Sequence, residues 1–416
     1  MNKLLYAVAV ASIAFTGVGC HPKTEQFTAE KGAKEVTLPT STKLNEIQVL
    51  GTHNSYAKPI DPAVINMIDP IMEQMGTKFM KSMSEEMMAR FKENHPNPMS
   101  FSEGLAYDHP DFVEQLDSGL RSFEIDVYYD PTGNRFHKPA TYELLKQRGI
   151  NELAPFDSVG LTKPGFKVLH VADIDFRTHY TTFRSALEEL KGWSDAHADH
   201  IPIFIMIEAK DMGIPLFPNS TEVLSFDNKA FMELDAEIIS ILGRDKVITP
   251  DDVRGNYKTL EEAVLAQSWP SLKSSLGKFV FMLLPSGAGT TDVDKTPYLQ
   301  GRPSLEDRVM FVRSEPGYPH AAFLLMDNAI VRKEEITEAV KKGYLVRTRS
   351  DIETYEAKVN DHSRKEAAFE SGAQVVSTDF FKSGNVYNTD YVVRMPNGKA
   401  ARVSPAVTKE LTASAQ

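Results

Sequence analysis

A histidine and an amide side chain stand together directly after an apolar run early in the chain. His53 and Asn54 follow Ile47–Leu50, and residues at the end of a buried strand can reach one ligand from a rigid base. Taken alone, such a pair is more typical of a capped loop than of a site. Later apolar runs end in the same way, so the sequence predicts chemistry at the ends of these runs.

Three later runs carry the other candidate groups. In chain order these are Glu124 and Asp126 within the run 122–127, His170 at the end of 167–170, and Glu208 at the end of 202–208. Because side chains alternate along a strand, Glu124 and Asp126 share one face of theirs. Four successive strands would then present polar groups at one end.

The candidate groups divide into metal ligands and proton-transfer groups. The oxygen donors are Asn54, Glu124, Asp126 and Glu208. Crowded carboxylates raise one another's pKa unless a cation lies between them, and ligands that are all oxygen suit Ca²⁺ before Mg²⁺. His53 and His170 remain for proton transfer and charge stabilisation. Two histidines beside a divalent cation fit phosphodiester cleavage, in which phosphorus gathers negative charge and the leaving oxygen needs a proton.

The elements that would position these groups are eight apolar runs with helical patterns between most of them. The runs are 47–50, 122–127, 167–170, 203–208, 278–284, 322–326, 344–347 and 373–377. This order predicts an α/β fold of the TIM-type (β/α)8 barrel class, in a regular or a distorted form. An open doubly wound sheet is the structural alternative, but the chain lacks its glycine-rich phosphate turn.

A long connection separates the first predicted strand from the second, and it predicts a helical insertion. Its methionines recur at spacings of three to five residues, at positions Met67, Met72, Met75, Met80, Met83 and Met87. One interpretation is that they fill gaps in a core. The other is that the insertion lies on the catalytic face and forms a lid or touches lipid.

Composition limits the class of partner. The chain has 416 residues, of which 42% are hydrophobic and 25% charged, as in ordinary soluble globular proteins. A net charge of −11 argues against nucleic-acid binding, which needs a basic surface. An anionic substrate must therefore be held by a local cluster of Lys, Arg or metal.

The amino-terminal segment predicts export. Lys3 precedes the apolar run Leu4–Val18, which is too short to span a bilayer, and Gly19 stands directly before Cys20, the single cysteine of the chain. This ending resembles a bacterial lipoprotein signal, in which the cysteine becomes the lipidated first residue. The expected location is a membrane surface, periplasmic or at the cell surface, with the chain anchored through Cys20.

The predicted organisation follows from these boundaries. It consists of a signal peptide at 1–19, a lipidated N-terminus and flexible tether at 20–42, the barrel at 43–390, and a C-terminal tail at 391–416. No second hydrophobic unit and no internal repeat interrupts the barrel. We expect it to act as a monomer.

The ordered motifs resemble the calcium-dependent phosphatidylinositol-specific phospholipases C, in their bacterial form, over residues 44–382. The matching stretches are 51–56 (GTHNSY), 116–128 (LDSGLRSFEIDVY), 168–170 (VLH), 173–176 (DIDF), 207–211 (IEAKD), 248–255 (ITPDDVRG), 344–351 (YLVRTRSD) and 372–379 (GAQVVSTD). The resemblance implies a barrel-shaped phosphodiesterase that needs Ca²⁺. Its implied substrate is a phosphoinositide or related phosphodiester lipid, and its products are diacylglycerol and a cyclic inositol phosphate.

The resemblance also implies roles for individual residues. His53 corresponds to the histidine that stabilises the pentavalent phosphorus, and His170 to the acid that protonates the diacylglycerol oxygen. The implied calcium ligands are Asn54, Glu124, Asp126 and Glu208, with Glu124 or Asp126 also helping to deprotonate the inositol 2-hydroxyl. The implied substrate-binding cations are Lys210, Arg347 and Arg349.

Two other functions compete with this one. A glycerophosphodiester phosphodiesterase shares barrel, metal and two histidines, but typically has His-Arg-Gly where this chain has His53-Asn54-Ser55. A surface lipoprotein that binds without catalysis is the second alternative. Both histidines and all four metal-ligand candidates are present, which disfavours it.

Overall fold

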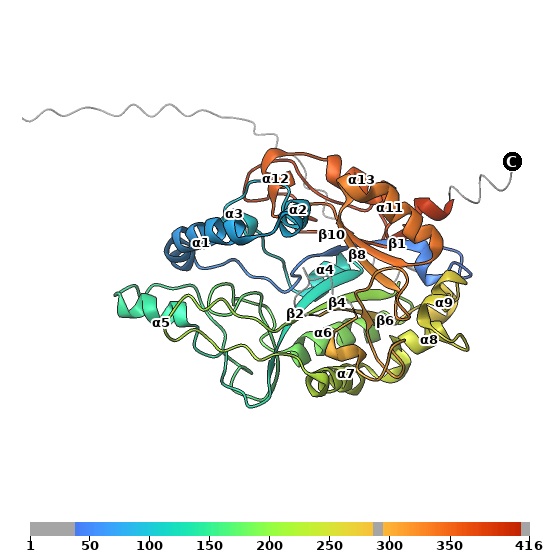
Figure 1. Ribbon diagram of the computed structural model, residues 1–416, viewed down its shortest axis with the longest axis horizontal. Helices are drawn as coiled ribbons and strands as arrows, with labels where there is room; N and C mark the ends of the chain where they lie inside the picture. The colour runs from blue at the N-terminus through green and yellow to red at the C-terminus, as the bar shows by residue number, and fades with distance from the viewer. Residues whose placement is uncertain (1–37, 286–293, 409–416) are drawn as a thin grey trace, which may run out of the picture. The chain divides into compact units, whose positions relative to one another are not determined.

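The strands curl into a ring of parallel neighbours. This computed structural model describes residues 38–285 and 294–408 (Figure 1). The ring strands are β1 (Ile47–Thr52), β2 (Ser122–Asp130), β4 (Ile203–Lys210), β6 (Phe279–Leu284), β7 (Phe311–Val312), β8 (Phe323–Asn328), β9 (Leu345–Arg349) and β10 (Val375–Thr378). Hydrogen-bonded neighbours follow the order β6-β4-β2-β1-β10-β9-β8, and β7 pairs with β6. A single parallel bridge, Arg313 to Phe323, joins the end of β7 to β8. This is the predicted distorted TIM-type barrel, with a single residue pair joining β7 to β8 and another joining β1 to β2.

One predicted barrel strand was assigned wrongly. Residues 167–170 were expected to form the third barrel strand, but β3 (Gly165–Val168) pairs antiparallel with β2 and lies off the ring. The eighth strand of the barrel is instead β7, which has two residues and therefore shows no periodicity in the sequence. A short strand, β5 (Val247–Ile248), pairs with the first half of β6.

Helices cover the outside of the sheet (Figure 1). Their bounds are α4 (Phe112–Asp117), α5 (Ala140–Gln147), α6 (Phe183–Ala196), α7 (Asn228–Leu242), α8 (Pro250–Arg254), α9 (Leu260–Leu265), α10 (Leu272–Ser275), α11 (Ala329–Lys342), α12 (Tyr355–Val359) and α13 (Ser363–Ser371), with short 3-10 turns at Leu44–Glu46, Arg244–Lys246 and Pro297–Leu299. Strand residues such as Ile125 and Val127 are fully buried in the main core. Their neighbours Glu124 and Asp126 therefore point to the other face of β2.

Strand β1 has three neighbours. Its second half pairs with β10 and touches β2 at one register pair, Gly51 with Ser122. A Cβ atom at position 51 would lie 2.3 Å from the Ser122 carbonyl oxygen, so glycine permits this close approach. The first half of β1 pairs antiparallel with β11 (Ala401–Val403). Residues 391–408, which the sequence placed in a C-terminal tail, thus include a strand of the sheet.

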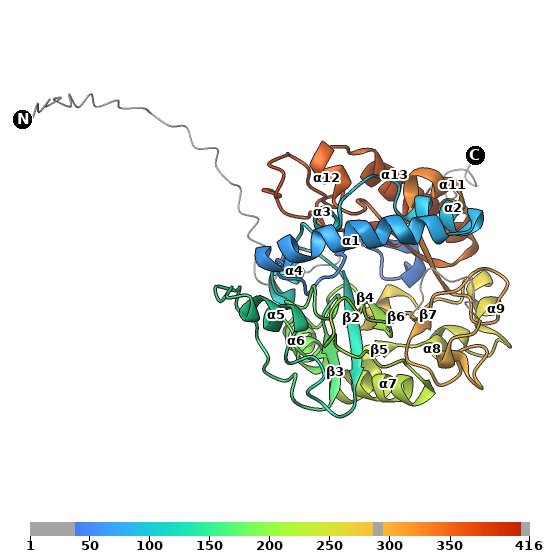
Figure 2. The same cartoon turned by 60° about the vertical axis from the view of Figure 1, so that its left-hand side comes forward.

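The predicted helical insertion lies between β1 and β2 and comprises α1 (Pro62–Ser82), α2 (Glu85–Asn94) and α3 (Phe101–Gly104). Helix α1 begins where Asp61 accepts a hydrogen bond from the Ala63 N–H at 2.7 Å and Pro62 occupies the first helical position. Figure 2 shows α1 running across the front of the barrel. Its first half packs on a second hydrophobic cluster through Val64 and Ile68.

The described residues all belong to one compact unit. The predicted signal peptide, Cys20 and most of the predicted tether lie outside the described residues. Among the helices that are described, none is long and apolar enough to cross a membrane.

Candidate active site

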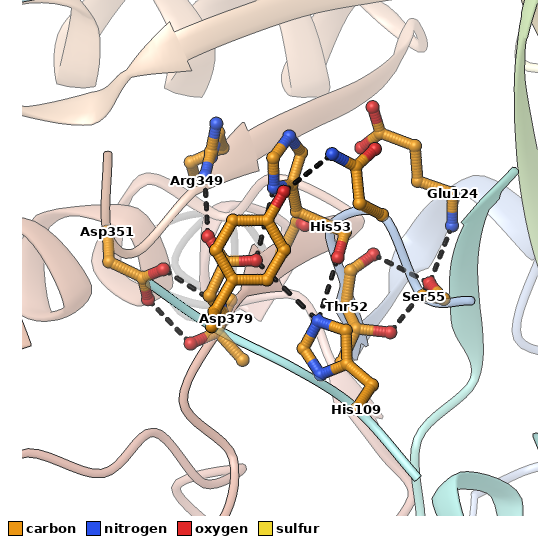
Figure 3. Close-up of polar contacts among 12 residues, drawn as sticks. Thr52, His53, Ser55, His109, Glu124, Arg349, Asp351 and Asp379 are labelled. Atoms are coloured by element: carbon orange, nitrogen blue, oxygen red, sulfur yellow. Dashed lines mark hydrogen bonds and ion pairs between the residues drawn. The ribbon is translucent and has the colours of Figure 1, made fainter. Parts of the chain in front are cut away.

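The loop after β1 is tied directly to β2. The Ser55 hydroxyl accepts a hydrogen bond from the Glu124 N–H at 2.8 Å and lies 2.6 Å from the Thr52 hydroxyl (Figure 3). Asn54 has φ +43°, a left-handed conformation that asparagine tolerates better than most residues. The sequence Thr52-His53-Asn54-Ser55 therefore fixes both His53 and Asn54 against the start of the acidic strand.

Three carboxylates from β2 and the second half of β4 meet on one face of the sheet. Asp126 pairs in register with Glu208, and ligand atoms of Glu124, Asp126 and Glu208 lie within 4.8 Å of one another. The structure thus brings together the three acidic side chains that the sequence predicted. No other such group of three or more acidic, histidine or cysteine ligands occurs within residues 38–285 and 294–408.

The electrostatics of this cluster call for a cation. Burial raises the pKa of Glu124, and it raises the pKa of Asp126 to about 6 against the opposing charge of Lys210. Lys210 Nζ lies 2.9 Å from both Asp126 Oδ2 and Glu208 Oε1. Burial opposes ionisation of Glu208 as well, but Lys210 outweighs it and the pKa of Glu208 is lowered.

The donor set fits Ca²⁺. The buried oxygens Asn54 Oδ1 and Asp126 Oδ1 have no hydrogen-bond partner among the described residues. An unpaired buried acceptor is costly unless something binds it. Oxygen donors from carboxylates and an amide are the ligands that Ca²⁺ prefers, so Asn54, Glu124, Asp126 and Glu208 would hold it.

His53 is held by a buried carboxylate. Its Nδ1 lies 3.1 Å from Asp379 Oδ1, and Arg349 binds the other Asp379 oxygen at 2.9 Å (Figure 3). The Asp379 N–H donates to Asp351 at 2.8 Å, and His109 Nε2 donates to the His53 carbonyl at 2.9 Å. Burial opposes ionisation of Asp379, but the positive partners outweigh it and its pKa is lowered. The pKa of His53 is also lowered, chiefly by burial and then by Arg349.

His170 is held in a similar way by a different carboxylate. Its Nδ1 lies 2.9 Å from Asp175 Oδ2, and the Tyr128 hydroxyl donates to its carbonyl at 2.9 Å. Burial opposes protonation of His170, but the hydrogen bond to Asp175 helps outweigh it and the pKa of His170 is raised. Because Nδ1 is bound to a carboxylate, Nε2 is left to face a substrate.

The three predicted substrate-binding cations all carry carboxylate partners in this structure. Lys210 bridges Asp126 and Glu208. Arg347 is buried and binds Glu124 Oε2 at 2.7 Å, with Asp327 as its second partner. Arg349 binds Asp379, while its buried Nε has no hydrogen-bond partner among the described residues. These cations thus lie within the site and also neutralise its acidic residues.

Four residues join the site without having been assigned a role from the sequence. They are Tyr107, His109, Asp175 and Asp379. Asp379 directly follows β10, so the strand-end rule that found Glu208 could have found it. Asp175 reaches His170 through a tight turn, closed by a 2.9 Å hydrogen bond from the Asp175 N–H to the Val171 carbonyl. Tyr107 and His109 lie on the connection between α3 and α4, and no local pattern predicts their contacts with Asn54 and His53.

A barrel with two carboxylate-held histidines and a cluster of three buried carboxylates is a phosphodiesterase type of site, and similarity in sequence gives the family. A sequence model of the family described as "Phosphoinositide phospholipase C, Ca2+-dependent" matches residues 42–405, and the chain belongs to this family. It is therefore a phosphoric diester hydrolase with a calcium cofactor. Among curated proteins, none matches the chain.

Two solved structures are similar over most of the chain. A Ca²⁺-dependent phosphatidylinositol-specific phospholipase C from Streptomyces antibioticus is 19% identical, with a TM-score of 0.47, covering 84% of this chain and 98% of that one. A calcium-dependent phosphoinositol-specific phospholipase C from a Gram-negative Pseudomonas species is 15% identical, with a TM-score of 0.47, covering 88% and 97%.

Proposed function

We propose that this enzyme cleaves phosphatidylinositol-type lipids to diacylglycerol and a cyclic inositol phosphate, with His53 and His170 acting on the phosphodiester. The observation that carries the proposal is the placement of two carboxylate-held histidines about one acidic cluster. The loop that carries His53 is tied to the cluster because the Ser55 hydroxyl accepts a hydrogen bond from the Glu124 N–H at 2.8 Å. His170 is tied to the same strand because the hydroxyl of Tyr128, two residues after Asp126, donates to the His170 carbonyl at 2.9 Å. A phosphodiester at the cluster would therefore lie near both imidazoles.

His170 is the general acid of this proposal. Its hydrogen bond to Asp175 favours the protonated ring, and the proton on Nε2 is the one available to a leaving oxygen. An alkoxide leaving group such as that of diacylglycerol is poor unless it is protonated as it departs. His53, fixed through Nδ1 by Asp379, presents Nε2 to the phosphoryl oxygens as negative charge gathers there.

The first step is an internal displacement. The inositol 2-hydroxyl oxygen forms a bond to phosphorus, and the bond from phosphorus to the diacylglycerol oxygen breaks, with its electron pair leaving on that oxygen. Glu124 receives the hydroxyl proton, and His170 supplies a proton to the leaving oxygen. An attacking group already joined to the phosphate ester gains proximity that free water lacks.

The remaining residues bind and orient. Asn54, Glu124, Asp126 and Glu208 hold Ca²⁺, which, when bound, supplies Lewis-acid stabilisation of charge on the phosphodiester. Lys210, Arg347 and Arg349 are the cations available to phosphate oxygens and inositol hydroxyls. Their present carboxylate partners would share them with a bound headgroup.

The deciding experiment compares headgroups. Phosphatidylinositol should release cyclic inositol phosphate in the presence of Ca²⁺, whereas phosphatidylcholine and a 2-O-methyl inositol lipid should be very poor substrates because neither has the attacking hydroxyl. Comparable rates on all three would mean that water attacks first, and would favour a glycerophosphodiesterase. Headgroup binding without any turnover would favour a binding lipoprotein.

The setting of this activity is also a proposal. The segment before residue 38 supports export and lipidation at Cys20, which would hold the enzyme at a membrane surface, periplasmic or outside the cell. A phosphoinositide lipid is the partner in this proposal, and the enzyme acts as a monomer.

A further inference from the structure

The apolar stripe of α1 continues beyond the core that it packs on. Val64 and Ile68 are fully buried, and Met72 is partly buried against the same cluster. Met75 and Phe79 follow at the next helical spacings of three and four residues, so they extend the same face. They are nevertheless 40% and 55% exposed. One half of the stripe therefore has a core to cover it and the other half does not.

The uncovered half is extensive. No residue between Glu73 and Ser82 is buried, a length of about 15 Å at the usual helical rise. Met80 on α1 and Met87 on α2 are also exposed, at 40% and 51%. Single exposed apolar residues are ordinary, but a cluster of large ones marks an interaction surface.

The uncovered half belongs to the segment that frames the active site. Helix α1 starts eight residues after Asn54, and the insertion then returns through Tyr107 and His109, which contact Asn54 and His53. In the view of Figure 2, α1 crosses the molecule above β2 and β4, the strands that carry the acidic cluster. A surface that this stripe contacts would therefore lie close to the catalytic end of the barrel.

The charges beside the stripe suit a phospholipid surface. Lys78 and Lys81 are exposed on the same half of α1, where Glu73 is the only acidic residue between positions 73 and 82. An amphipathic helix with apolar and basic sides lies in the plane of a bilayer interface, where basic residues attract anionic lipids.

We propose that Met75, Phe79, Met80 and Met87 form the surface by which this enzyme docks on a lipid bilayer, with Lys78 and Lys81 facing the headgroups. This inference rests on the proposed function, because a diacylglycerol lipid remains in its bilayer while its headgroup enters the site. Docking through α1 brings the catalytic end of the barrel to the membrane plane.

Tryptophan fluorescence tests the contact locally, independently of any lipid anchor at Cys20. The two native tryptophans, Trp193 and Trp269, are 7% and 4% exposed, so lipid should not reach them. Phe79→Trp adds a reporter on α1, and Met232→Trp adds a matched one on α7, where Met232 is 56% exposed. In full-length protein with chelator present, vesicles of phosphatidylcholine and phosphatidylinositol with brominated acyl chains should quench the added fluorescence of Phe79→Trp only.

Turnover tests the consequence. Phe79→Ser should slow hydrolysis of phosphatidylinositol in vesicles by about tenfold or more, because burying a phenylalanine is worth roughly that factor in binding. Its rate on a water-soluble inositol phosphodiester with a nitrophenyl leaving group should not change. Met232→Ser should alter neither rate.

The outcomes separate the two proposals. Absent quenching in Phe79→Trp, or equal quenching in both variants, overturns the docking surface. So does a wild-type dimer that Phe79→Ser converts to a monomer without any effect on vesicles, since the stripe would then pack on a second copy. Selective quenching in an enzyme that cleaves no inositol lipid would keep the docking surface and overturn the proposed function.

Discussion

The Asn54 side chain donates a hydrogen bond to the Tyr107 hydroxyl at 2.6 Å, and this contact orients the amide. With its nitrogen bound to Tyr107, the buried Oδ1 is left as the free acceptor. Tyr107 lies between α3 and α4, so the insertion reaches back to position a side chain at the end of β1. The insertion thus helps to orient one of the proposed calcium ligands.

Removal of this hydroxyl should weaken calcium binding. Tyr107→Phe keeps the ring but leaves the Asn54 amide free to turn, and loss of a contact that orients a metal ligand typically costs about 10- to 100-fold in affinity. Calorimetric titration with CaCl2 measures the change. Tyr129→Phe is the matched control, since it removes a hydroxyl that donates to Glu233 at 2.8 Å on the outside of the barrel. Equal calcium affinity in all three proteins would contradict the role of Tyr107.

The pair of His170 and Asp175 predicts a pH effect with a definite sign. The hydrogen bond to Asp175 raises the pKa of His170, so the acid form persists to higher pH. Asp175→Asn should lower that pKa. As the pH is raised, the rate of lipid hydrolysis should therefore begin to fall at a lower pH in the variant than in the wild type.

His170→Ala should slow cleavage of the lipid by about 100-fold or more, the usual contribution of a general acid. A substrate with a nitrophenyl leaving group needs no proton and is the internal control. Its rate should be almost insensitive to both His170→Ala and Asp175→Asn in a pH–rate series. If His170→Ala damages both substrates equally, the acid assignment is wrong.

Calcium should stabilise the folded protein. A ligand that binds only the folded state adds about 2.7 kcal/mol when its concentration is about 100 times its Kd, so CaCl2 should raise the Tm and excess chelator should abolish activity. Glu208→Gln should remove most of the rise in Tm with CaCl2 and most of the calcium-dependent activity. Glu233→Gln, a half-exposed acidic residue on α7, should behave as wild type. Full activity in excess chelator would refute the calcium requirement.

Two glycines should respond to alanine with opposite signs. Gly51→Ala places a Cβ atom 2.3 Å from a backbone oxygen, and overpacking of this kind typically costs about 1–3 kcal/mol. Gly76 in α1 has no atom within 4 Å of the added carbon, so Gly76→Ala should gain about 0.5–1 kcal/mol from helix propensity. Urea unfolding measures both. A neutral Gly51→Ala would mean that β1 and β2 can separate without cost.

Cys20 tests the proposed anchor. Cys20→Ser should release a soluble form of the enzyme or leave the signal peptide uncut, because no thiol remains for lipidation. Membrane fractionation of cells that express each protein distinguishes these results. Unchanged fractionation of the variant would count against lipidation.

The fold could be predicted from the sequence where periodicity is strong. The ring strands of five residues or more contain runs that show it, and their order gave the barrel. Strand β7 has two residues, so its pairing is decided by neighbours that no local pattern reveals. Strand β3 shows the opposite error, because a buried strand has the same pattern whether it joins the ring or pairs beside it.

The site could be predicted to the same extent. Residues carried by a strand, such as Asp126 and Glu208, follow from alternation and register. Contacts such as those of Asn54 with Tyr107 depend on how a connection of more than fifty residues folds back. The exposure of Phe79 depends on where the hydrophobic cluster under α1 ends, and that position cannot be predicted from composition.

The pairing of β1 with β11 has a consequence for biosynthesis. The first half of β1 finds its antiparallel neighbour only at Ala401–Val403, more than 350 positions later. After β1 has emerged from the ribosome, nearly the whole barrel must therefore be synthesised before β11 can pair with the first half of β1. Until then the nascent chain presents an unpaired apolar strand, the kind of edge that invites wrong association. Protection of this edge during translation is therefore a requirement that the topology itself imposes.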